Sequence, residues 1–134
     1  MASILKVDEL QGIVSAGDIT VTSEGGAATQ SLQQGLAKAW VNIDGTGTTE
    51  IRDSLNVSGV VDNGTGQSTI TYSNSLSNQN YSVTSACQLV GTSTVEIATS
   101  TVSASQTKIV TIQRNTGATS DHEEGFIHAM GDLA

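Results

Sequence analysis

Short runs of alternating apolar and polar residues, broken by glycine and asparagine turns, constrain this fold more than any other feature. From Ala37 onward they recur at a spacing of roughly ten residues, as they do in β-sandwiches and barrels. The runs are AWVNID (39–44), EIRDSLNVSGVV (50–61), STITYS (68–73), YSVTSACQLV (81–90), TVEIATS (94–100), TKIVTIQ (107–113) and GFIHAMG (125–131). The pattern predicts an all-β protein, with an antiparallel, jelly-roll-like β-sandwich over residues 36–134.

The apolar residues are mostly β-branched. Val and Ile together number 22, whereas the aromatic residues are only Trp40, Tyr72, Tyr81 and Phe126. β-branched side chains pack well on pleated sheets, but a chain with few aromatic residues builds a thin core. We therefore expect self-association to bury further surface.

Residues 1–35 differ from the rest and are expected to form an N-terminal arm for attachment and oligomerisation. Residues 4–8 and 18–22 alternate with a period of two, which predicts two strands with one covered face. The candidate oligomerisation or attachment residues are Ile4, Val7, Ile19 and Val21. Residues 27–39 favour one helical turn about as strongly as an irregular segment, since Gly35 interrupts otherwise helix-tolerant residues.

The alternation also predicts which side chains point into the sandwich. Tyr81, Val83, Ser85, Cys87 and Leu89 share one face if Ser82, Thr84, Ala86 and Gln88 face outward. We expect Cys87 to be buried. Trp40 is expected to be a core residue rather than a stacking platform for a carbohydrate, because exposed aromatic residues that bind sugars usually come in sets and the chain has one tryptophan.

The acidic charge of the chain and its lack of long apolar runs argue against nucleic acid and membranes as partners. The formal net charge of −8 argues against binding to nucleic acid, which requires clusters of Lys and Arg. No apolar run is long enough for a membrane span, and the start of the chain lacks the features of a signal peptide. We expect synthesis in a cytoplasm and no membrane insertion. A single cysteine, Cys87, forms no disulfide within the chain.

The best catalytic or metal-binding candidate is the segment 121–124, Asp-His-Glu-Glu, followed by His128. Its spacing is poor, because His122 and His128 are six residues apart and fit no i, i+4 helical pair. Two Gly-Thr-Gly segments, residues 45–47 and 64–66, match only fragments of phosphate-binding loops. We expect both segments to be hairpin turns. We expect no catalytic residues, no cofactor and no metal site.

Four segments together resemble a domain that recurs in fibre and other virion proteins of tailed bacteriophages, notably marine phages. Its pattern is "K-AWVNF-G-G…I-DSFNVSSI-DNGTG-Y…NYSV". The matching segments are GLAKAWVNIDGTG (35–47), IRDSLNV (51–57), DNGTG (62–66) and NYSV (80–83), and the opening SILKVD (3–8) is similar to the start of many short structural proteins of this group. The sequence departs from the pattern at Ile43 and Leu55, where the family often has phenylalanine, and at residues 67–70.

The resemblance implies a non-enzymatic, homotrimeric module on the virion surface: a short tail or head fibre, or a capsid decoration protein. The implied partners are further copies of the chain and other capsid or tail proteins. The arm binds these proteins, while residues 36–134 project from the particle. One alternative is a receptor-binding module of a tail fibre, in which loops 45–49, 62–67, 77–80 and 115–124 contact a host glycan or protein. Another is a carbohydrate-active enzyme, which needs a carboxylate pair that the sequence does not supply.

Overall fold

The computed structural model describes residues 5–15, 19–88 and 95–134. The chain divides into two units, Met1–Leu36 and Ala37–Ala134. In the first unit, β1 (Thr20–Thr22) pairs antiparallel with β2 (Thr29–Ser31), with Val21 opposite Gln30. The helical turn α1 (Leu32–Gly35) follows directly and is capped by Ser31, whose Oγ accepts a hydrogen bond from Gln34 N at 3.4 Å.

The first unit has no core of its own among its described residues, none of which is buried. The strand expected at residues 4–8 is wrong for residues 5–8, which are irregular, and Ile4 lies outside the described residues. The physical reason is that a strand needs a partner for its backbone N–H and C=O groups, and the described part of the chain offers residues 5–8 none. Of the strand expected at 18–22, Thr20–Thr22 form β1 and Asp18 lies outside the described residues. The covered face expected for it is wrong, because all three residues of β1 are exposed.

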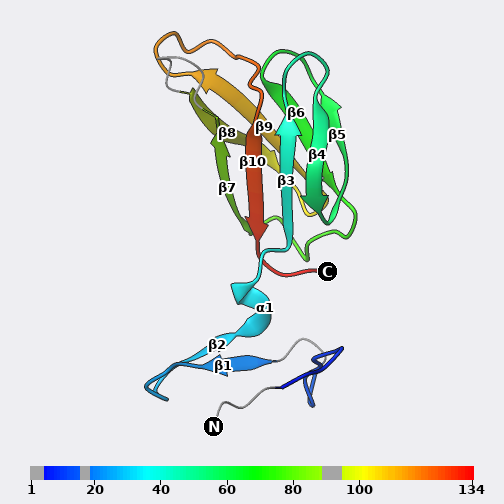
Figure 1. Cartoon of the computed structure of the whole chain (residues 1–134), viewed down its shortest axis with the longest axis vertical. Coiled ribbons are helices and arrows are strands. Elements are labelled where there is room, and N and C mark those ends of the chain that lie inside the picture. Colours follow the sequence, from blue (N-terminus) through cyan, green and yellow to red (C-terminus); the bar gives the residue numbers. More distant parts are fainter. Residues whose placement is uncertain (1–4, 16–18, 89–94) are drawn as a thin grey trace. The chain divides into compact units, whose positions relative to one another are not determined.

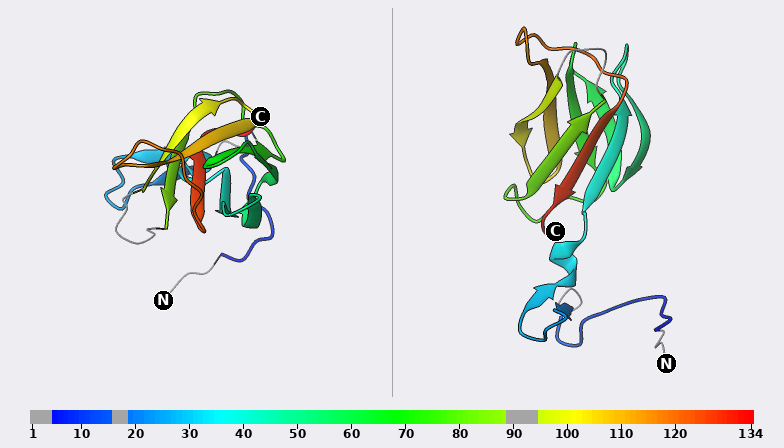
Figure 2. Two further views of the ribbon diagram at one scale, coloured as in Figure 1. Left: turned by 90° about the horizontal axis from the view of Figure 1, so that it is seen from above. Right: turned by 60° about the vertical axis from the view of Figure 1, so that its left-hand side comes forward.

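The second unit is an antiparallel β-sandwich, which confirms the predicted all-β class. Its strands are β3 (Ala39–Asp44), β4 (Glu50–Leu55), β5 (Val57–Asp62), β6 (Gln67–Tyr72), β7 (Ser82–Cys87), β8 (Val95–Val102), β9 (Gln106–Gln113) and β10 (Gly125–Met130). They form two four-stranded sheets in the orders β4-β3-β10-β7 and β5-β6-β9-β8, which lie face to face (Figures 1 and 2). The four-and-four division is that of a jelly roll. The pairs β3–β4, β5–β6 and β8–β9, however, are hairpins within one sheet.

Asn56 divides a segment that the sequence pattern treats as one run. Its φ of +56° places the backbone in the left-handed region, which asparagine tolerates better than most residues. The side chain holds this turn in place: Asn56 Nδ2 donates to the carbonyls of Lys38 and Asn74 at 3.0 Å, and Oδ1 accepts from Asn74 N at 2.7 Å. The chain thereby leaves one sheet at Leu55 and enters the other at Val57.

The core lies between the sheets and contains aliphatic residues with two tyrosines at its margin. Its fully buried large side chains include Ile70, Leu76 and Ile109. Tyr72 and Tyr81 Oη both lie within hydrogen-bond distance of Thr107 Oγ1, at 2.5 and 2.7 Å, and Thr107 is 0% exposed. These three hydroxyl groups satisfy one another across the two layers, which offsets the desolvation of polar groups in a core with few aromatic residues.

The inward face predicted for β7 is confirmed where it is described: Tyr81, Val83, Ser85 and Cys87 are partly buried while their neighbours are exposed, and Leu89 lies outside the described residues. Burial of Cys87 is thus partial rather than complete.

The core position expected for Trp40 is wrong. Ala39, Val41 and Ile43 of β3 are buried at 2–4% exposure, so the alternation of the strand turns Trp40 to the outer face of its sheet. There Trp40 is opposite His128, which is exposed, and Leu55, which is 48% exposed.

Candidate functional site

The first candidate site is the apolar surface of residues 5–36. Val7 and Val21 are each 51% exposed, Ile19 is partly buried, and the Ile19 carbonyl accepts a hydrogen bond from Leu32 N at 2.8 Å. The candidate residues chosen from the sequence leave out five further exposed apolar residues in this unit, Leu5 (77%), Leu10 (57%), Ile13 (103%), Val14 (92%) and Leu36 (54%). Val21 and Leu36 line a hollow of about 200 Å³ together with Leu32.

Apolar side chains that remain in water within a unit without a core are available for burial against another protein. Scattered exposed apolar residues are normal, but here they are concentrated in one short segment. The acidic residues Asp8, Glu9 and Glu24 lie in the same segment. Chemically, the segment can bind through apolar contacts and through the free edges of β1 and β2.

The second candidate site is the end of the sandwich where loops 45–49, 63–66 and 114–124 meet, which we call the His122 end (Figure 1). Gly45 N donates to the His122 carbonyl at 2.9 Å, and Gly66 N donates to Asp121 Oδ1 at 2.6 Å. Side chains on Gly45 and Gly66 would collide with the 120–122 backbone. The Gly-Thr-Gly segments are therefore turns against which the last loop packs closely.

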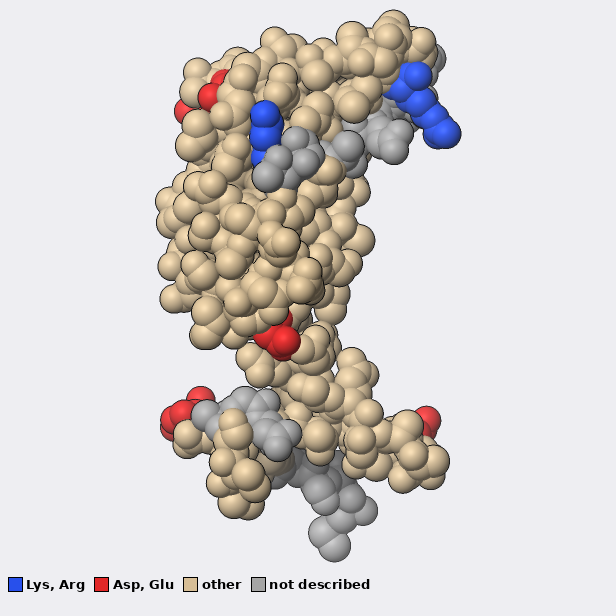
Figure 3. All heavy atoms as spheres, turned by 180° about the vertical axis from the view of Figure 1, so that it is seen from behind, with Lys and Arg blue, Asp and Glu red and all other residues tan. Residues whose placement is uncertain are grey.

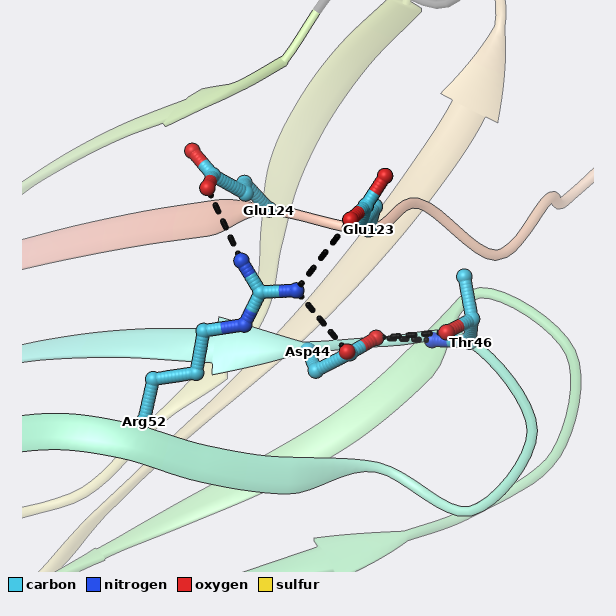
Figure 4. Close-up of polar contacts among 5 residues, drawn as sticks. All are labelled: Asp44, Thr46, Arg52, Glu123 and Glu124. Atoms are coloured by element: carbon cyan, nitrogen blue, oxygen red, sulfur yellow. Dashed lines mark hydrogen bonds and ion pairs between the residues drawn. The ribbon is translucent and has the colours of Figure 1, made fainter.

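Arg52 gathers three carboxylates at this end (Figure 4). Its guanidinium contacts Asp44 Oδ2 and Glu124 Oε1 at 2.8 Å each, and Glu123 Oε1 at 3.7 Å. Thr46 and Arg52 hold the pKa of Asp44 at about 2, the Thr46 hydroxyl being the largest cause. Because one guanidinium contacts all three carboxylates, the cluster ties β4 to β3 and to the segment before β10.

His122 closes the end of the core and is 8% exposed. It lines a hollow of about 20 Å³, together with Cys87 and the hydroxyl-bearing Thr49 and Ser68, whose Oγ1 and Oγ atoms lie 3.1 Å apart. Neither ring nitrogen of His122 has a hydrogen-bond partner, so Cys87 and His122 do not form the hydrogen-bonded pair that thiol catalysis needs. Burial also raises the pKa of the Cys87 thiol, which disfavours the reactive thiolate.

The two histidines of the sequence-level metal candidate are not brought together. His122 is buried beneath the loops, whereas His128 is exposed on β10, on the face opposite to the buried Ile127 and Ala129. Across residues 5–15, 19–88 and 95–134, no group of three His, Cys, Asp or Glu side chains is arranged to hold a metal ion. The segment 121–124 instead supplies one core residue and two ion-pair partners.

The stability of the sandwich is expected to depend on pH through His122. Burial lowers the pKa of this ring below 6.5, against a smaller opposing effect of Asp121, so the unfolded chain takes up a proton that the folded chain resists. The free energy of unfolding should fall as the pH drops through 6.5 and level off below the depressed pKa, by at most about 1.4 kcal/mol per pH unit.

Urea denaturation of the wild type and of His122→Gln at several pH values between about 8 and 5 measures this dependence. The variant is expected to lose the histidine contribution to the slope. His128→Gln is the matched control and should keep it, because His122 is still present. An equal slope in wild type and His122→Gln would show that His122 is solvated in solution.

Comparisons of the chain with protein-family models, with curated proteins and with solved structures gave no match. Among the described residues, no helix is both long and apolar enough to cross a membrane.

Proposed function

We propose that this chain is a structural protein of a bacteriophage virion: a homotrimeric surface module that docks through residues 1–35 and projects the β-sandwich. It acts as a short tail or head fibre or as a capsid decoration protein, and it performs no catalysis. Its partners are two further copies of itself and the capsid or tail proteins to which it attaches.

Two independent features support this proposal. The resemblance to phage virion proteins in GLAKAWVNIDGTG, IRDSLNV, DNGTG and NYSV suggests the particle. The observation that carries the attachment role is that seven apolar residues between Leu5 and Leu36 are at least 51% exposed, while no described residue of that unit is buried. A segment of this kind gains stability only when another surface covers it.

The docking mechanism follows from the chemistry of the arm. Exposed backbone groups at the edges of β1 and β2 can extend a sheet of a neighbouring copy or of a particle protein, which fixes the register. Burial of Val7, Val21 and the other exposed apolar side chains then supplies affinity at ~25 cal/mol per Å² of apolar surface. Three copies around one axis can cover these side chains without a second domain.

The full-length protein is expected to be a trimer in solution at micromolar concentration. Sedimentation velocity and light scattering measure its mass directly, and the expected value is three times that of the 13.7 kDa chain. A mass of one chain at this concentration would refute the isolated trimer. The attachment role would then rest on whether cryo-EM of the phage particle shows the sandwich on its surface.

A further inference from the structure

The outer face of the β4-β3-β10-β7 sheet carries two of the four aromatic residues of the chain. Trp40 lies opposite His128, and Asn42 lies opposite Phe126, so the two rings occupy diagonal positions on the paired strands β3 and β10. Same-face diagonal neighbours lie about 7–8 Å apart, within reach of aromatic side chains. The pairing of β3 with β10 thus places the exposed Phe126 beside the partly buried Trp40 on one outer face.

Polar and apolar side chains surround the two rings. In one row across the sheet, Trp40 and His128 lie between Leu55 and Thr84, and in the next row Asn42 and Phe126 lie between Asp53 and Ala86. Asn42 Oδ1 is itself buried and has no hydrogen-bond partner. Phe126 and His128 form one wall of an open hollow of about 140 Å³ that also includes Thr84 and Ala86.

The opposite sheet provides a contrast within the same molecule. The outer face of β5-β6-β9-β8, seen in Figure 3, has few charged side chains. Its described positions on β5, β6 and β9 include Val61, Thr69, Thr71, Gln106 and Lys108, and none is aromatic. An aromatic pair on the outer surface, with Phe126 exposed and Trp40 partly buried, is therefore a property of one face of the sandwich.

Size and charge decide what this face can bind. Its large exposed apolar residues are Leu55, Phe126 and Met130, at 48%, 37% and 40% exposure. A stable protein interface uses roughly 800 Å² and 20–30 residues from each partner, many more than these three. Asp53 on this face and the net charge of −8 repel nucleic acid and anionic polymers.

We propose that the outer face of the β4-β3-β10-β7 sheet is a binding site for a neutral carbohydrate. Phe126, with the accessible part of Trp40, stacks against the apolar C–H faces of sugar rings, and the exposed Thr84 and His128 exchange hydrogen bonds with the hydroxyl groups. A neutral sugar matches the acidic surface and offers both kinds of contact at once. The site lies wholly within residues 37–134, so it does not rest on docking of the arm.

Trp40 is the only tryptophan of the chain, so its fluorescence reports directly on this face. The full-length protein is titrated with neutral polysaccharides, namely dextran, laminarin, yeast mannan and a galactan, and with heparin as the anionic probe. At least one neutral polysaccharide is expected to shift the Trp40 emission to shorter wavelength with saturation, and heparin is not. Affinity electrophoresis in gels that contain the same polysaccharides provides a second readout.

Phe126→Ala and His128→Ala are expected to weaken binding of that polysaccharide at least tenfold. Both residues are exposed, so the fold is retained, which circular dichroism verifies. Val61→Ala, at a 55% exposed apolar position on the other sheet, is the control and should bind like the wild type.

Three results would overturn the proposal: no response to any of the four neutral polysaccharides, binding of heparin alone, or equal affinity of the Phe126 and His128 variants and the wild type. A wild-type oligomer that Phe126→Ala dissociates would instead identify the face as a contact between copies. That last result would also contradict trimer formation through the arm, whereas the three carbohydrate results leave the attachment role untouched, because the mass of the wild type and its incorporation into particles test that role separately.

Discussion

Deletion of residues 1–34 is expected to leave a folded sandwich that no longer forms trimers and no longer enters phage particles. The core residues, including Ile70, Leu76 and Ile109, all belong to residues 37–134, so the fold does not need the arm. The deletion removes six of the seven exposed apolar residues between Leu5 and Leu36. Light scattering of the truncated protein, and immunoblots of particles purified from cells that express it, measure the two losses.

A pair of point variants tests whether trimer formation depends on apolar contacts of the arm and not only on its presence. Val21 and Thr22 are neighbours on β1, both exposed, and only Val21 is apolar. Val21→Asp should weaken trimer formation, because a carboxylate cannot be buried in an apolar contact without a large desolvation cost, whereas Thr22→Asp should have little effect. Normal incorporation of the truncated protein would place attachment in the sandwich and refute the role of the arm.

Gly66→Ala is expected to destabilise the sandwich by about 3–5 kcal/mol, the largest effect of any single glycine substitution. The φ of Gly66 is +66°, and a Cβ atom there would meet Ser120 N at 2.6 Å and the carbonyl oxygens of Ser120 and Thr111 at 2.8 Å. These are backbone atoms of a strand and of the loop that covers the His122 end, so they cannot move aside cheaply. For a unit of about 100 residues, the melting temperature should fall by at least about 12 °C.

Gly47→Ala is the matched control for Gly66→Ala. Its φ of +67° is nearly the same, but nothing lies within 4 Å of the Cβ position. It should cost only about 1 kcal/mol, the penalty for an alanine in the left-handed region. The difference between the two variants in free energy of unfolding, measured by urea denaturation, gives the cost of the collision with the 120–121 segment. Equal costs would show that this loop moves away from Gly66 in solution.

The alternation of short runs predicted most of the sandwich, because burial of one sheet face imposes a period of two on every strand. The run 39–44 coincides with β3, and 125–131 contains β10. The run 50–61 was wrong as a single element, because its apolar pattern continues through Asn56. The break between the two strands depends on hydrogen bonds to Lys38 and Asn74, which are distant in sequence. In the sequence itself, only the asparagine at position 56 indicates a turn there.

The prediction for Trp40 failed for a different reason. Both faces of the run AWVNID are plausible inward faces, since Trp40 competes with Ala39, Val41 and Ile43, and a large aromatic residue is the usual core candidate. The structure places the three smaller residues inside, on the same sheet face as the buried Ile127 and Ala129 of β10, and this face packs against the opposite sheet. Which face of a strand is buried depends on what its partners present, and local periodicity does not contain that information.

The sequence by itself determined the all-β class, the antiparallel hairpins and the separation of an apolar, glycine-rich N-terminal segment from a regular sandwich. These properties depend on residue type and short-range spacing, since turns and alternation are local. The tertiary structure alone decided that His122 is buried while His128 is exposed, that Arg52 neutralises Asp44 and Glu124, and that Trp40 and Phe126 share an outer face. Each of these depends on strand pairing between distant segments, such as β3 with β10, and that pairing is selected by packing of the whole core.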